Sequence, residues 1–112
     1  MTQSDELPSE FARVASAAEI APGTARACAI GEREVALFNV GGEFFALENT
    51  CPHQGAPIAG GTLEGALVTC PWHGWCFDVR TGKMTLGEFA SIDRYAVRQA
   101  GRDIYVSREP VV

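Results

Sequence analysis

Two short stretches decide how this chain can fold: Cys-Pro-His-Gln-Gly-Ala-Pro at residues 51–57 and Cys-Pro-Trp-His-Gly-Trp-Cys-Phe-Asp at residues 70–78. We call them the first box and the second box. Each offers one thiolate and one imidazole, from Cys51 and His53 in the first and from Cys70 and His73 in the second. Two sulfur and two nitrogen ligands match a [2Fe–2S] cluster in which one iron is held by two Cys and the other by two His.

The spacing of these residues is compatible with one shared cluster. Two side chains that are two or three residues apart in an irregular loop can point the same way. The segment 54–69, between His53 and Cys70, is long enough for a short hairpin that brings the two loop tips together. Glycines in and around the boxes let the backbone bend tightly and approach the sulfides without a Cβ clash; they are Gly55, Gly60, Gly61, Gly65 and Gly74.

Other interpretations of the four residues remain open. Zinc sites of the Cys2His2 type usually group like ligands, whereas each box here is mixed. A box pair that has lost its metal is a further possibility. A disulfide between Cys51 and Cys70 would leave both histidines unexplained, and the composition is not that of a disulfide-stapled secreted domain.

The two boxes resemble the cluster-binding boxes of Rieske-type [2Fe–2S] proteins, and the resemblance extends over about residues 10–108. It implies an antiparallel β-sandwich with a small cluster-binding subdomain formed by two loops, at about residues 49–79. Among members of the family, the chain is most similar to the small ferredoxins of multicomponent oxygenases, and it is also similar to the small subunit of NADH-dependent nitrite reductase. The implied ligands are Cys51, His53, Cys70 and His73, surrounded by Gln54, Gly55, Ala56, Trp72, Gly74 and Trp75.

The chain departs from the respiratory members of the family in informative ways. Ala56 and Trp72 stand where those proteins carry two further cysteines that bridge the loops, so this bridge cannot form. Trp75 and Phe77 replace a serine and a tyrosine whose hydroxyls donate hydrogen bonds near the cluster. Fewer donors leave the reduced cluster less stabilised, which predicts a potential of roughly −150 mV, at the low end of the Rieske range. The segment that would cover the cluster, residues 84–89, lacks the family's proline.

Length and composition predict a single small domain. The chain has 112 residues, of which 46% are hydrophobic, enough for one modest core. We expect a flexible N-terminal arm at residues 1–9 and one domain at residues 10–108. No apolar run reaches the length of a membrane helix, and the first residues are polar and acidic, unlike a signal peptide. The expected location is the cytoplasm.

Short segments with alternating polarity, separated by glycines, predict an antiparallel all-β architecture. Gly41-Gly42 predicts a two-residue hairpin. A turn or a single helical turn is expected at residues 18–23. The predicted strands are residues 11–15, 24–30, 34–40, 43–48, 67–69, 76–79, 94–99 and 103–107.

The remaining cysteines and the tryptophans have simpler expected roles. Cys28 alternates among small residues and is predicted to be a buried core thiol, while Cys76 is predicted to be a packed or surface thiol and not a ligand. Trp75 is expected to pack within the cluster subdomain. Trp72 could instead form an exposed apolar collar with Ala56, Pro57 and Ile58 that keeps water away and offers a docking face.

Charge narrows the function. The net charge of −5 argues against a nucleic-acid partner, and residues 34–79 contain five acids and no Lys or Arg. This half could steer a partner with a basic rim, or could be a merely solvated surface.

Two functions stay open: a carrier between a flavin-dependent reductase and a terminal oxygenase, or a bound small subunit of a larger reductase. A catalytic oxygenase is excluded, because it needs a mononuclear iron site with further histidines. The chain has only His53 and His73, and both are assigned to the cluster.

Overall fold

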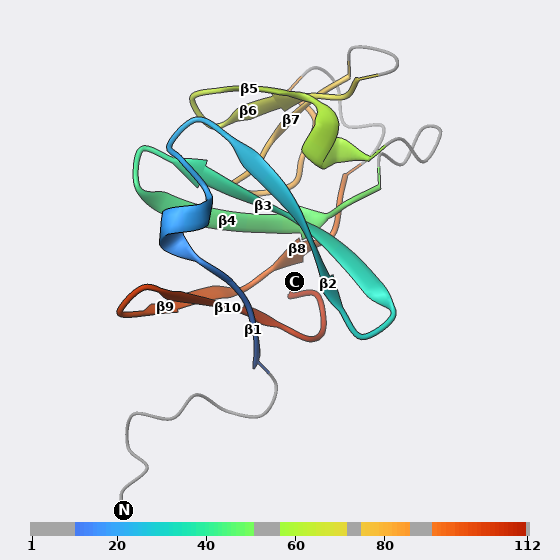
Figure 1. The fold of residues 1–112 in the computed structure, drawn as a ribbon. Helices are drawn as coiled ribbons and strands as arrows, with labels where there is room; N and C mark the ends of the chain where they lie inside the picture. Colours follow the sequence, from blue (N-terminus) through green and yellow to red (C-terminus); the bar gives the residue numbers. More distant parts are fainter. Residues whose placement is uncertain (1–10, 51–56, 72–74, 86–90, 112) are drawn as a thin grey trace, which may run out of the picture.

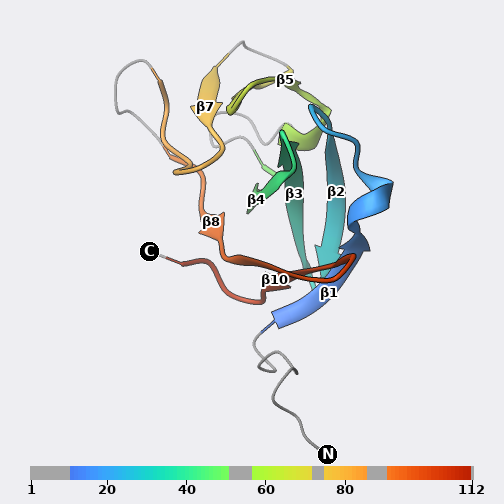
Figure 2. The same cartoon turned by 90° about the vertical axis from the view of Figure 1, so that its left-hand side faces the viewer.

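The computed structural model describes residues 11–50, 57–71, 75–85 and 91–111. The described residues form three antiparallel sheets stacked in layers (Figures 1 and 2). The outer sheet has the order β1-β10-β9, the central sheet β2-β3-β4-β8, and the cap sheet β5-β6-β7. The strands are β1 Phe11–Ser16, β2 Ala25–Ile30, β3 Arg33–Val40, β4 Glu43–Glu48, β5 Thr62–Glu64, β6 Leu67–Thr69, β7 Cys76–Asp78, β8 Arg94–Tyr95, β9 Val97–Ala100 and β10 Asp103–Ser107.

Strand β3, inside the central sheet, is buried on both faces, and this explains its unbroken apolar run. Successive side chains of a strand point to opposite faces. Val35 and Leu37 therefore pack toward the outer sheet, and Ala36 and Phe38 pack toward the cap sheet. All four of these side chains are fully buried.

Two hydrophobic cores fill the spaces between the three layers. The core between the outer and central sheets includes Ile104 and Val106 of β10 together with Ile30 of β2. The core between the central and cap sheets includes Val68 of β6, Phe77 of β7 and Leu47 of β4. The second core holds the cap sheet, and with it the second box, against the rest of the domain.

Tight turns close the hairpins of the central sheet. Val40 pairs with Glu43 across Gly41 and Gly42, as predicted, and both glycines have positive φ values of 61° and 101°. These angles are accessible to glycine at little cost, which fits a two-residue hairpin.

The predicted all-β architecture is confirmed, with differences in detail. Residues 94–99 were expected to form one strand but form β8 and β9, because the chain leaves the central sheet at Ala96 to join the outer sheet. The strand β5 and the 3-10 turn η2 (Ile58–Gly60) were not predicted. The expected helical turn is η1 (Ala17–Glu19), which Ser16 and Glu19 close with reciprocal side-chain hydrogen bonds.

The expected N-terminal arm lies outside the described residues. At the other end, Val111 donates a main-chain hydrogen bond to the carbonyl of Arg94 at 2.7 Å. The segment after β10 therefore returns to the central sheet. Within the described ranges, no helix is long and apolar enough to cross a membrane.

Candidate metal centre

Of the four predicted ligands, Cys70 lies within the described residues. The structure places its side chain in the core between the central and cap sheets, with 2% of its surface exposed. The other predicted site residues lie outside the described residues, apart from Trp75; they are Cys51, His53, Gln54, Gly55, Ala56, Trp72, His73 and Gly74. The positions of the two box loops are therefore described through the residues at the base of each loop, which we call its root.

The root of the second box is the loop end of the β6–β7 hairpin, where residues 70–75 join the two strands. Thr69 pairs with Cys76 across the two strands. One step further, the N–H of Cys70 donates to the carbonyl of Trp75 at 2.7 Å. The loop that carries His73 is thus closed at its base by strand pairing and by this main-chain hydrogen bond.

The root of the first box is closed by a side chain. Asn49 follows β4 directly, and its Oδ1 accepts a hydrogen bond from the N–H of Ala59 in η2 at 2.7 Å. The bond joins the chain on the two sides of the segment 50–58, which contains Cys51 and His53. Asn49 is itself fixed to β3, because its N–H donates to the carbonyl of Glu34 at 2.9 Å.

The two roots lie against each other. After η2 the backbone of Gly61 approaches the carbonyl of Thr69 so closely that a Cβ at this position would lie 2.0 Å from that oxygen. Ile58, at the start of η2, is fully buried in the same core as Cys70. The exit of the first box is therefore packed against the residue that precedes Cys70.

These observations fit the proposed cofactor. The described roots bring the two boxes together, and each box carries one candidate thiolate ligand and one candidate imidazole ligand. Elsewhere in the described part of the chain, no group of three or more His, Cys, Asp or Glu side chains could hold a metal ion. Soft thiolate ligands combined with imidazole are a donor set suited to an iron–sulfur cluster with mixed ligation.

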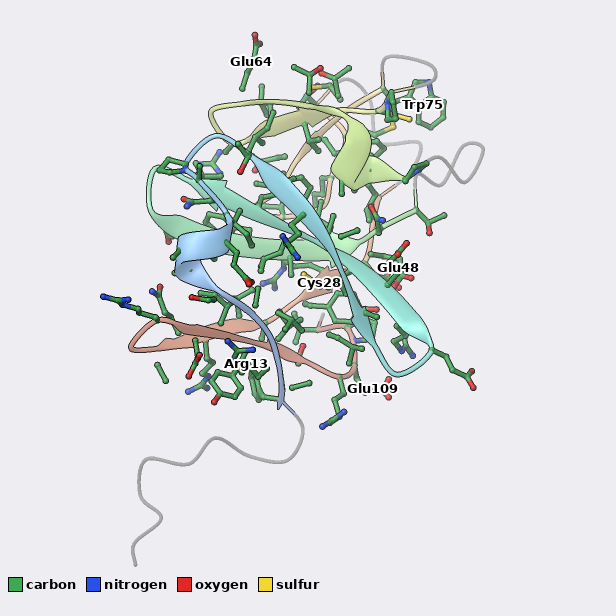
Figure 3. All side chains as sticks on the ribbon, viewed as in Figure 1. Arg13, Cys28, Glu48, Glu64, Trp75 and Glu109 are labelled. Carbon is green, nitrogen blue, oxygen red and sulfur yellow. The ribbon has the colours of Figure 1, made fainter. Side chains whose placement is uncertain are left out.

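Trp75 and the two cysteines that are not proposed as ligands have the surroundings predicted for them. Trp75 is half-buried and packs against the core below the cap sheet (Figure 3). Cys28 is buried between the outer and central sheets, and burial raises the pKa of its thiol. Cys76 is half-buried, with its sulfur 3.9 Å from the hydroxyl of Thr69.

The expected exposed collar is wrong at one position. Ile58 is fully buried, because η2 turns it inward onto the core, so it contributes nothing to a docking face. Pro57, directly before it, is exposed. The remaining proposed collar residues, Ala56 and Trp72, lie outside the described residues.

The five acids of residues 34–79 are spread over the described part of the domain. Glu64 lies at the turn end of the cap sheet, opposite to the end that bears Cys70, and Glu43 lies at the far end of β4 from Asn49 (Figure 3). Asp78 forms an ion pair with Arg80, whose hydrogen bond holds the pKa of Asp78 below its usual value. Glu43 and Glu64 thus lie away from the box roots, and the steering of a basic partner stays a prediction.

The two acids nearest the first box are engaged in hydrogen bonds. The carboxylate of Glu34 accepts from Nδ2 of Asn49 at 3.0 Å. Glu48 accepts from the hydroxyl of Tyr95 at 2.5 Å, and that hydroxyl in turn accepts from Arg33 at 3.1 Å. These side chains tie the end of β4 to β3 and β8.

The hydroxyl of Tyr95 makes the stability of the domain depend on pH in alkali. Burial, followed by the hydrogen bond to Glu48, raises the pKa of Tyr95 to about 12. The unfolded chain releases this proton near pH 10, so between about pH 10 and 12 the native state binds more protons. The free energy of unfolding should therefore be undiminished by this group below pH 10 and should fall as the pH rises through this window.

The variant Tyr95→Phe tests this contribution. It should lower the free energy of unfolding at neutral pH by about 1–2 kcal/mol, because Glu48 and Arg33 lose a shared partner. It should also flatten the decline between pH 10 and 12. Urea denaturation of both proteins from pH 8 to 12 measures the difference, and parallel curves would show that Tyr95 does not cause the decline.

Sequence reasoning missed Asn49 and Glu34, which close the first box. The only available signal was a polar residue two positions before Cys51. Its partners come from β3 and η2, and no local pattern in the sequence pairs these elements.

With the site's roots placed, comparison with known proteins decides the family. The family described as Rieske [2Fe-2S] domain matches residues 10–96, which include both boxes. The chain belongs to the Rieske [2Fe–2S] family. The family's cofactor is a [2Fe–2S] cluster of the Rieske type, and the chain carries the two Cys and two His residues that this cluster requires.

This Rieske domain is similar along most of its length to proteins of different size. It is 38% identical over 98 residues to the biphenyl dioxygenase ferredoxin subunit of Pseudomonas sp. (strain KKS102), covering 86% of this chain and 90% of the relative. It is 37% identical over 98 residues to apoptosis-inducing factor 3 of Homo sapiens, covering 85% of this chain but 16% of the relative. The chain thus spans about a sixth of that protein, and the likeness there concerns the Rieske domain alone.

A solved structure shows the same fold. A chain from the complex of reduced oxygenase and oxidized ferredoxin in carbazole 1,9a-dioxygenase superposes with a TM-score of 0.85 at 31% identity. The match covers 94% of this chain and 99% of the other. The arrangement of the sheets in this chain is therefore that of the similar chain in the solved complex.

Proposed function

We propose that this chain is a one-electron carrier that passes electrons from a flavin-dependent reductase to a terminal oxygenase. The observation that carries the proposal is the end-to-end match with a dioxygenase ferredoxin subunit, which covers 86% of this chain and 90% of that protein.

When bound, a [2Fe–2S] cluster accepts and releases single electrons. The chain's own residues hold and shield it. Cys51, His53, Cys70 and His73 would be the ligands, and burial of Cys70 keeps water from one side of the site. Trp75 packs beside Cys70 and limits solvent access there.

The proposed partners follow from the relatives. The solved complex that contains the similar chain joins an oxygenase and a ferredoxin, which supports a terminal oxygenase as the electron acceptor here. A flavin-dependent reductase would be the donor. We place the carrier in the cytoplasm with these partners and expect a potential of roughly −150 mV, because Phe77 offers no hydroxyl to the cluster.

Low-temperature EPR before and after dithionite tests the cofactor. Anaerobically purified protein should be silent when oxidised and should give a rhombic signal on reduction. Absence of an EPR signal in both states, together with zinc found by elemental analysis, would show that the chain is a structural metal module. The proposed electron-transfer function would then be wrong.

Purification from the native cell tests the role of carrier against that of a bound subunit. A carrier should elute alone and at the size of the single chain, and it should be reduced by a flavin-dependent ferredoxin reductase supplied with NADH. Stable co-elution with a large reductase subunit would favour the small-subunit alternative.

A further inference from the structure

We propose that Asn49 is a positioning residue for the cluster: its side chain clamps the neck of the first box and thereby determines how Cys51 and His53 are held. The inference rests on the proposed cofactor and adds to it a residue that is not a ligand. The clamp is the pair of side-chain hydrogen bonds from Asn49 to Glu34 and Ala59.

The position of Asn49 is set by three hydrogen bonds. Its N–H donates to the carbonyl of Glu34 at 2.9 Å, its Nδ2 donates to the carboxylate of Glu34 at 3.0 Å, and its Oδ1 accepts from the N–H of Ala59 at 2.7 Å. The residue is 5% exposed. A buried amide with a donor partner and an acceptor partner has one orientation that satisfies both.

The chemistry of the clamp selects asparagine. An aspartate could accept from Ala59 but would place a second carboxylate against that of Glu34, and neighbouring like charges repel. A glutamine would be one methylene too long for the same two partners. An alanine would leave the N–H of Ala59 without its acceptor.

The clamp connects the first box to the second. On one side Asn49 is fixed to β3, in the central sheet. On the other side Ala59 lies in η2, two residues before the contact of Gly61 with Thr69. Loss of the clamp would therefore loosen the first box relative to Cys70, while the sheets retain their pairing.

Asn39 provides a matched control. It is also a buried asparagine, 4% exposed, with Nδ2 donating to the carbonyl of Ile20 at 2.7 Å and Oδ1 accepting from the N–H of Gly42 at 2.7 Å. It lies at the opposite end of β3, beside the Gly41-Gly42 turn. Replacing it removes the same number of side-chain hydrogen bonds far from the boxes.

The experiment compares Asn49→Ala with Asn39→Ala in the cluster-containing protein. We measure iron release to a chelator under conditions in which both variants remain folded by circular dichroism, and the EPR line shape after reduction. Asn49→Ala should release iron about tenfold faster than the wild type and should broaden the EPR lines, because the ligands of the first box are held in a wider range of geometries. Asn39→Ala should lower the urea midpoint but leave the release rate within about twofold and the line shape unchanged. Loss of residues that orient metal ligands typically weakens metal binding by about 10–100-fold, which sets the expected scale.

The second test exchanges the amide and the carboxylate between positions 49 and 34. It can replace the first test if Asn49→Ala does not fold. Asn49→Asp should accelerate iron release, and adding Glu34→Gln should slow it again. In the double variant the glutamine amide can donate to the new carboxylate, and the net charge equals that of the wild type. Recovery of the EPR line shape should accompany the slower release.

Three results would overturn the positioning role. They are equal acceleration of iron release in the Asn49 and Asn39 variants, unchanged release in Asn49→Ala, and no recovery in the double variant. In each of these the wild-type EPR signal would still support the proposed carrier. Absence of that signal from the wild type would overturn the carrier and the clamp together.

Discussion

Cys70→Ser should abolish the cluster, whereas Cys76→Ser should leave it in place. Val68, Cys70 and Phe77 face the core under the cap sheet. Cys76 pairs with Thr69 and lies on the other face, with its sulfur near the Thr69 hydroxyl. The two variants make the same chemical change at positions six residues apart. Cys70→Ser removes a proposed ligand, whereas Cys76→Ser removes a half-exposed thiol.

Iron content and the reduced EPR signal measure the outcome. Serine oxygen is a harder ligand than thiolate and is poorly suited to an iron–sulfur cluster. Loss of a residue that only orients a metal ligand typically lowers metal affinity by about 10–100-fold. The loss of a ligand should therefore lower the iron content of purified Cys70→Ser by at least about tenfold. Equal iron in both serine variants would show that Cys70 is not a ligand.

The strands could be predicted from local sequence because their signals are local. Alternation and glycine turns placed β4, β6 and β10 at the residues where they lie. β5 is missing from the prediction because Thr62–Glu64 is short and carries one partly buried apolar side chain, Leu63. Its strand character comes from pairing with β6, which depends on the hairpin already being closed.

The sequence singles out candidate ligands but not the residues that support them. Two Cys and two His in two short boxes predict a metal centre from their chemistry alone. Asn49, Glu34 and Ala59 look ordinary in sequence and acquire their role from contacts between β3, the end of β4 and η2. The burial of Ile58 likewise follows from the 3-10 turn that aims it inward, and nothing in the sequence around Pro57 indicates that turn.

Gly61→Ala should strongly destabilise the domain and loosen the cluster. A Cβ at this position would lie 2.0 Å from the carbonyl oxygen of Thr69 and 3.2 Å from that of Ile58. Both are backbone atoms, and Thr69 is paired with Thr62 on one side and Cys76 on the other. Relief of the clash must move β6 or η2, which we expect to cost about 2–4 kcal/mol of the free energy of unfolding.

The neighbouring glycine separates crowding from the general effect of adding a methyl group. A Cβ on Gly60 would meet nothing within 4 Å, and its φ is not in the left-handed region. Gly60→Ala should therefore change the free energy of unfolding by less than about 1 kcal/mol and should raise it if anything, because alanine restricts the unfolded chain. Urea denaturation and iron retention of the two variants measure the contrast. Since Thr69 precedes Cys70, the displacement in Gly61→Ala should also accelerate iron release, and a Gly61→Ala protein as stable as Gly60→Ala would show that the two box roots are not packed this closely.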